Sequence, residues 1–237
     1  MISECPTIYR SHVLISASLL LLLITSIVLV IGCTKPDSHN PGILLLDTLV
    51  EGIPAVPLPP ETASNRLNEY YLLVKQYASV VEERRESFHN LFIQIRNDWL
   101  GPLSSGKGYE WKLLHDDGIS VTSFYITAGD SITFTLSHSG PSTKPMSPFT
   151  GWLDQHNNSG LVDFIDISFG GFGWFPYPEG LSMGTSDPGF SYGVIDSSTG
   201  GGRVEVWEIL LDAQWFEGGW DEVGHGWCGS LFDGPDW

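Results

Sequence analysis

The hydrophobic pattern divides the chain into three parts, and this pattern predicts most of its organisation. Residues 13–33 form a mainly apolar run without a charged side chain. Residues 61–100 repeat apolar side chains with helical spacing, whereas several stretches of residues 101–237 alternate apolar and polar side chains. A helix repeats about every 3.6 residues and a strand every two, so these patterns predict a helix followed by a β-domain.

The helical segment carries an apolar stripe in which one row recurs every seven residues. That row is Leu67, Val74, Val81, Phe88 and Ile95, and a second row is Tyr70, Tyr77 and Leu91. Such a stripe must be buried against an apolar surface. It packs on the chain's own sheet or against a second copy in a coiled coil, so self-association through residues 61–100 is one of the two interpretations.

The β-domain is predicted from alternating stretches joined by turn residues. The candidate strands are residues 109–116, 119–127, 131–138, 149–154, 161–169 and 203–211. Asp117-Gly118, Ala128-Gly129-Asp130 and Asn157-Asn158-Ser159-Gly160 are typical hairpin connections. We expect an antiparallel meander with one buried and one wet face. Residues 170–202 are rich in Gly and Pro, which predicts a long irregular loop.

The expected fold class is therefore α+β: one long amphipathic helix and an antiparallel β-meander, after an N-terminal signal or anchor helix. The expected segments are a leader (1–32), a Pro-rich tether (33–60), the helix (61–100) and the β-domain (101–237), whose C-terminal part is acidic and rich in Gly and Trp. An apolar insert in the tether, Ile43 to Leu46, either docks on the folded domain or lies against a membrane surface.

The charge is strongly negative and unevenly distributed. The net charge is −17, and from Pro145 to the end one cation, Arg203, stands against fourteen Asp and Glu. A surface this acidic repels nucleic acids and anionic lipid headgroups, so nucleic acid is not an expected partner.

The apolar run ends in Val30-Ile31-Gly32-Cys33, which resembles the lipobox of bacterial lipoproteins. The resemblance implies cleavage before Cys33 and acylation of its thiol and new amino terminus, with membrane lipid as the partner. Thr34 replaces the aspartate associated with inner-membrane retention, so the resemblance implies an extracytoplasmic protein at the outer membrane or cell surface. The leader has one cation, Arg10, offset by Glu4, and the run is long enough to span a bilayer, so an uncleaved transmembrane anchor is the alternative.

No motif predicts catalysis, a metal or a cofactor. Gly189-Phe190-Ser191-Tyr192-Gly193 matches G-x-S-x-G, but its flanks lack the strand and helix of a nucleophile elbow. Asp221 and His225 lie among glycines that disfavour the helix their spacing needs. Asp154, His156 and Asn158 lack the Gly and Glu of a calcium loop. If Cys33 is lipidated, Cys228 is the remaining thiol of the exported part, expected to be structural.

Tryptophan is concentrated in the last third of the chain. Large rings fill the core of a small β-domain, or they form an exposed platform for a sugar or peptide. In the second interpretation Trp220 and Trp227 are the candidate ligand-binding residues.

These patterns favour a membrane-anchored, non-enzymatic protein with a binding or assembly role at the envelope. The alternatives are an exported carboxylate-dependent hydrolase, a glycan-binding module, and a pilin-like subunit with an uncleaved N-terminal helix. The Pro-rich gap between Gly32 and Thr62 interrupts the continuous helix that a pilin needs.

Overall fold

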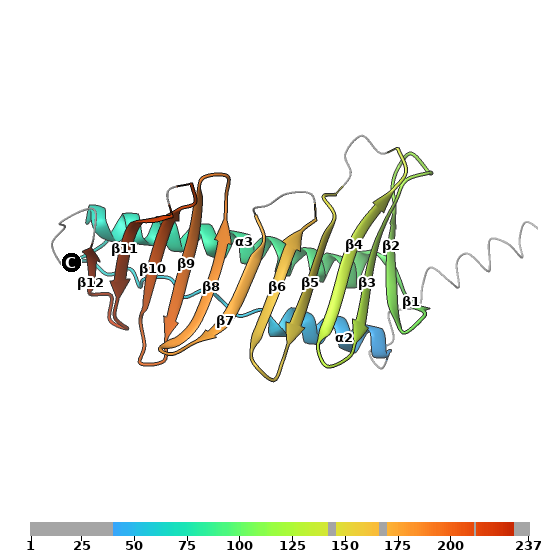
Figure 1. Cartoon of the computed structure of the whole chain (residues 1–237), viewed down its shortest axis with the longest axis horizontal. Coiled ribbons are helices and arrows are strands. Elements are labelled where there is room, and N and C mark those ends of the chain that lie inside the picture. The colour runs from blue at the N-terminus through green and yellow to red at the C-terminus, as the bar shows by residue number, and fades with distance from the viewer. Residues whose placement is uncertain (1–39, 142–145, 166–169, 211, 230–237) are drawn as a thin grey trace, which may run out of the picture. The chain divides into compact units, whose positions relative to one another are not determined.

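The protein is described by a computed structural model that covers residues 40–141, 146–165, 170–210 and 212–229. From Pro41 on, twelve strands form one antiparallel sheet in which each strand pairs with its neighbours in the sequence (Figure 1). The strands are β1 Leu100–Ser105, β2 Gly108–Leu114, β3 Val121–Ala128, β4 Ile132–Ser139, β5 Phe149–Asp154, β6 Ser159–Phe164, β7 Phe172–Tyr177, β8 Gly180–Ser186, β9 Phe190–Ser197, β10 Gly202–Glu208, β11 Ala213–Trp220 and β12 Gly226–Gly229.

Two helices lie against one face of this sheet, α2 Pro41–Gly52 and α3 Glu69–Asp98 (Figure 1). Asn68 starts α3, because its side-chain oxygen accepts the backbone N–H groups of Tyr70 and Tyr71 at 2.9 and 3.2 Å. The 30 residues of α3 span about 45 Å, equal to roughly nine strand spacings of ~4.8 Å. One helix is therefore long enough to cross most of the sheet.

The core lies between α3 and the sheet face beneath it. The helix residues that are buried there are Tyr71, Val74, Ala78, Val81, Phe88, Phe92 and Ile95. Near the start of α3, the ring of Tyr77 lies 5.0 Å from Phe216 on β11, and near its end Phe92 lies 5.4 Å from Phe134 on β4. The helix thus runs from the C-terminal strands back to the N-terminal strands, and the chain then returns through the meander.

The predicted meander and its hairpins are confirmed. Asp117-Gly118 connects β2 to β3, and Asn157-Asn158 connects β5 to β6. The apolar row of the long helix is buried against the chain's own sheet at Val74, Val81, Phe88 and Ile95. Leu67 is 85% exposed, because the helix begins only after Asn68.

The predicted fold class is wrong. An α+β fold with one long helix and a smaller meander was expected, whereas the structure is mainly a β-sheet domain with two helices on one sheet face. The second helix, α2, lies in the stretch predicted as a Pro-rich tether. Its apolar insert docks on the domain, since Ile43 and Leu46 are 2% and 0% exposed.

The irregular loop predicted over residues 170–202 is also wrong, because β7, β8 and β9 occupy it. Their inward residues are apolar and buried, as at Phe172, Met183 and Val194. Glycines at outward positions conceal the alternation, since glycine ordinarily weakens a strand and indicates a turn.

Within the described residues, no helix has both the length and the apolar character that spanning a bilayer requires. The leader and its Val30–Cys33 motif lie outside the described residues.

Candidate functional site

The two faces of the sheet differ in what covers them. The inner face packs against α2 and α3, and we call the opposite one the outer face (Figure 1). A trough on the outer face crosses β6 to β10 and encloses about 460 Å³. It is the candidate functional site, because concave surfaces are where ligands bind most often.

Glycines form the floor of the trough. Gly173, Gly184 and Gly193 pair directly with one another across β7, β8 and β9. The same row continues to Leu161 on β6 and to Glu205 on β10, whose side chains border the floor. Three neighbouring strands thus carry no side chain in this row, and the Phe175 ring and the Leu161 side chain lie against the Gly173 position.

Packing does not require glycine at every floor position. A Cβ on Gly193 would have its nearest neighbours at 3.9 and 4.0 Å, an ordinary contact distance. By contrast, Cβ atoms on the inward-facing Gly160 and Gly218 would overlap Trp174 and Val74. The inward glycines make room for core side chains, whereas Gly193 leaves open space above the sheet.

Aromatic rings and hydroxyl groups line the trough. Phe175 on β7 is 45% exposed and Trp207 on β10 is 38% exposed. The ring of Trp152 lies 6.0 Å from that of Phe175 and supports it from β5. Three serines add hydroxyl groups from β8 and β9, namely Ser182, Ser186 and Ser191. Rings and hydroxyls together suit a ligand that has both apolar faces and polar edges.

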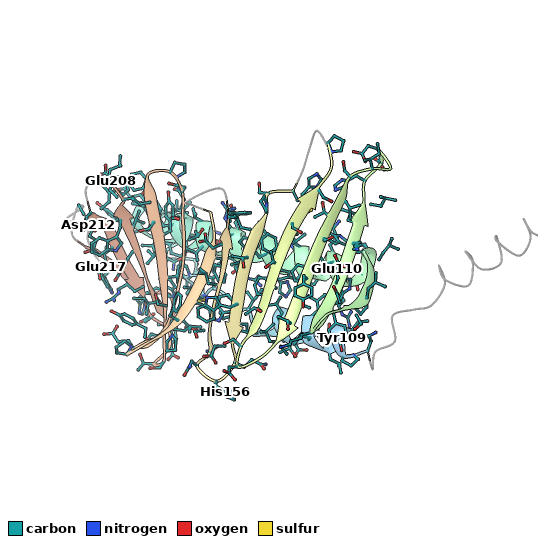
Figure 2. All side chains as sticks on the ribbon, turned by 45° about the vertical axis from the view of Figure 1, so that its right-hand side comes forward. Tyr109, Glu110, His156, Glu208, Asp212 and Glu217 are labelled. Atoms are coloured by element: carbon teal, nitrogen blue, oxygen red, sulfur yellow. The ribbon has the colours of Figure 1, made fainter. Side chains whose placement is uncertain are left out.

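Carboxylates stand on both sides of the floor. Asp163 on β6 is exposed, and one of its oxygens lies 3.2 Å from where a Cβ on Gly171 would be, so its carboxylate stands at the edge of the trough beside Gly171. On the other side, Glu205 accepts a hydrogen bond of 3.4 Å from Nε1 of Trp207. Figure 2 shows further acids, Glu208 and Glu217, gathered at this end of the sheet.

Arg203 is embedded among these acids. Its guanidinium lies 3.0 Å from Glu205, 3.7 Å from Glu217 and 3.9 Å from Glu179. Partial burial acts to lower the pKa of Arg203, but Glu205, the Tyr177 hydroxyl and the other two carboxylates outweigh it and raise that pKa. The positive charge is therefore fixed and shared by three acids, and the outer face stays negative.

The turn between β8 and β9 directly follows the lining residue Ser186 and is held by Asp187. Its carboxylate accepts the Tyr192 hydroxyl at 2.7 Å and the backbone N–H groups of Gly189 and Phe190 at 3.0 and 2.9 Å. Burial opposes ionisation of Asp187, yet these hydrogen bonds lower its pKa. Burial, followed by the hydrogen bond to Asp187 and its charge, raises the pKa of Tyr192 to about 12.

The two tryptophans proposed from sequence do not form one platform. Trp220 is buried, 6% exposed, and its ring packs over Gly202 on the inner face. Trp227 is 40% exposed and packs over Gly219 on the outer face, outside the trough. Cys33, the predicted lipidation site, lies outside the described residues.

The motifs with catalytic or metal-binding spacing have structural roles. Ser191 lies on β9 and lines the trough within a regular strand, which is not a nucleophile elbow. Asp221 accepts the N–H groups of Val223 and His225 in the β11–β12 turn. Asp154 makes the same kind of contact with His156 at the β5–β6 turn, which Figure 2 places at the lower rim of the sheet, where the strands end.

Reactive and metal-binding groups are scarce in the described part of the chain. Three or more His, Cys, Asp or Glu do not come together there as a set of metal ligands. Burial raises the pKa of the Cys228 thiol, which makes it a poor nucleophile. The hydroxyl of Thr122 lies 2.7 Å from His115 and 3.1 Å from His138, but Thr122 is 0% exposed and out of reach of a substrate.

The fold and the site together define a single-sheet β-domain that is covered by helices on one face and carries an open, acidic trough on the other. No protein-family model, curated protein or solved structure matches this chain.

Proposed function

We propose that this protein is a non-enzymatic glycan-binding module, held at the outside of a bacterial envelope by acylation of Cys33. The observation that carries the proposal is the glycine row of Gly173, Gly184 and Gly193, which leaves a flat floor between walls of aromatic and acidic side chains. A sugar ring has apolar faces and a rim of hydroxyls. The exposed rings of Phe175 and Trp207 suit the faces, and carboxylates and serines suit the rim.

The position of the trough in the sheet favours a glycan over a peptide. Peptides that bind sheets usually add a strand at a free edge, where backbone groups are unpaired. The floor strands β7, β8 and β9 each pair on both sides, so their backbone groups are already used. A ligand in the trough must bind through side chains and ring faces.

The carboxylates of the trough do not form a glycosidase pair. Asp163 and Glu205 lie on strands four spacings apart, roughly 19 Å, whereas the two acids of a glycosidase are about 5 to 9.5 Å apart. Glu205 and Glu217 are direct neighbours across β10 and β11, but the Arg203 guanidinium contacts both of them. It fills the space that a glycosidic bond would need.

Titration of the full chain in detergent with soluble oligosaccharides tests the binding function. Trp207→Ala and Phe175→Ala should each weaken binding at least tenfold, while circular dichroism and the melting temperature remain those of a folded protein. Trp227→Ala is the matched control, because Trp227 is as exposed as Trp207 but lies outside the trough. Loss of binding in the control alone would move the site to β12, and no binding by the unmutated chain would refute the function.

Metabolic labelling with a palmitate analogue tests the anchor. The unmutated chain should take up the label and Cys33→Ser should not. An intact mass that retains the initiating methionine on an unlabelled chain would instead indicate an uncleaved anchor.

A further inference from the structure

We infer that the trough selects glycans that carry free amino groups over neutral and anionic glycans. This inference rests on the proposed glycan-binding function and adds the chemical class of the ligand. It follows from the charge around the trough and from the character of its exposed rings.

The acids around the trough outnumber the cations near it, which are Arg203 and, beside Gly170, Arg84 of α3. Arg203 is the single Lys or Arg from Pro145 to the end of the chain, and three carboxylates already share its guanidinium. Asp163 stands beside Gly171 on one side of the trough, and Glu205 stands on the other. A ligand entering between them meets a net negative field, because the carboxylates of Asp163, Glu179, Glu205 and Glu217 outnumber the nearby guanidinium groups. Such a field attracts ammonium groups and repels carboxylate or sulfate groups.

The exposed rings add to this preference. An ammonium group that approaches an aromatic face within about 6 Å is attracted by roughly 0.5–1 kcal/mol at an exposed site. Phe175 and Trp207 lie on opposite sides of the glycine floor and present such faces. The same rings stack on apolar sugar faces, so an amino sugar can stack on the rings and pair its ammonium group with the carboxylates. An N-acetylated sugar keeps the stacking and loses the charge.

The experiment compares oligosaccharides of equal length that differ in charge. Isothermal titration of the full chain in detergent uses oligomers of glucosamine, N-acetylglucosamine and glucose, and an oligogalacturonate, at a pH where the amines are protonated. We expect the glucosamine oligomer to bind roughly tenfold more tightly than its acetylated form at low salt, the effect of about two exposed ion pairs. The preference should shrink at 1 M salt, where the Debye length is only about 3 Å.

A matched pair of charge variants locates the effect. Asp163→Asn should weaken binding of the glucosamine oligomer roughly two- to fivefold more than binding of the acetylated oligomer, because Asn still forms hydrogen bonds with hydroxyl groups but carries no charge. Glu51→Gln removes the same charge from the exposed surface of α2, on the opposite side of the sheet, and should change neither affinity.

The outcomes separate this inference from the proposed function. Equal or tighter binding of the acetylated or glucose oligomer overturns the amino-group preference and leaves glycan binding intact. No binding of any oligosaccharide overturns both. An oligolysine of equal charge that displaces the glucosamine oligomer and binds more tightly would identify the ligand as a basic peptide and would also overturn the inference.

Discussion

A side chain added to the glycine floor of the trough should stabilise the fold and weaken ligand binding. Gly193 lies in the middle of β9 with its outward side open, and the nearest atoms to an added Cβ are carbonyl oxygens of Glu205 and Met183 at 3.9 and 4.0 Å. Gly193→Val therefore adds a side chain without a clash at Cβ. It also replaces the residue least suited to a strand interior by one of the best suited.

The expected gain in the free energy of unfolding is about 0.5–1 kcal/mol, the usual cost of glycine within a strand. For a domain of this size, such a gain raises the melting temperature by roughly 1–4 °C. The valine side chain would project into the trough, so binding of the oligosaccharide should fall by at least tenfold. If Gly193→Val raises the free energy of unfolding and abolishes binding, the glycine at position 193 serves ligand binding and not stability.

Thermal unfolding followed by circular dichroism, with titration of the same samples, provides both measurements. Gly151→Val is the contrasting variant, because a Cβ there would overlap the Leu161 carbonyl oxygen and the Phe134 ring. It should destabilise the protein by about 1–3 kcal/mol, as overpacking does. A lower melting temperature for Gly193→Val, or unchanged binding, would refute the reasoning that the glycine floor is an open binding surface.

Three further outcomes follow from local contacts. Asn68→Ala should destabilise the protein by about 1 kcal/mol in urea unfolding, because it removes the cap of α3. Hydrogen bonds from Ser120 lower the pKa of Asp117 from 3.8 to about 2. The ionised carboxylate therefore stabilises the fold above pH 3.8, and this stabilisation is lost as the pH falls towards 2. Asp117→Asn should therefore flatten the acid limb of a stability–pH profile in that window, and an unchanged limb would contradict it. Cys228 should react with a thiol reagent only after unfolding, since it is 7% exposed and burial raises its pKa; rapid labelling of the native protein would disprove this.

The parts of the fold that could be predicted are those in which one physical signal dominates. In β4, Ile132, Phe134 and Leu136 alternate with polar residues, and in α3 the buried row recurs with helical spacing. Hairpin connections such as Asp117-Gly118 have a local cause, since glycine accepts the positive φ of 67° that the turn needs. Such signals are contained within a few residues and need no knowledge of the tertiary structure.

The second helix and the edge strands could not be predicted in the same way. Pro41 begins α2, where a proline is tolerated because the first N–H groups of a helix have no partner within it. The surrounding prolines nevertheless indicate extended chain. Similarly, Gly101 and Pro102 predict the end of a helix. They nevertheless lie in β1, an edge strand, where proline is tolerated. In both places tertiary packing decides between two local interpretations.

The trough could not be predicted from the sequence, because glycine has opposite roles on the two faces of the sheet. Gly160 and Gly218 point inward, where Trp174 and Val74 fill the space that a Cβ would need. Gly193 points outward, where nothing fills that space. A strand alternates its faces with every residue, so shifting the register by one position exchanges these roles. The sequence shows a run of glycines in both cases, and only the pairing of β7, β8 and β9 reveals that three of them are aligned. Gly193 weakens its strand and gains no packing from its open side, so under the proposed function a bound ligand would compensate for that loss.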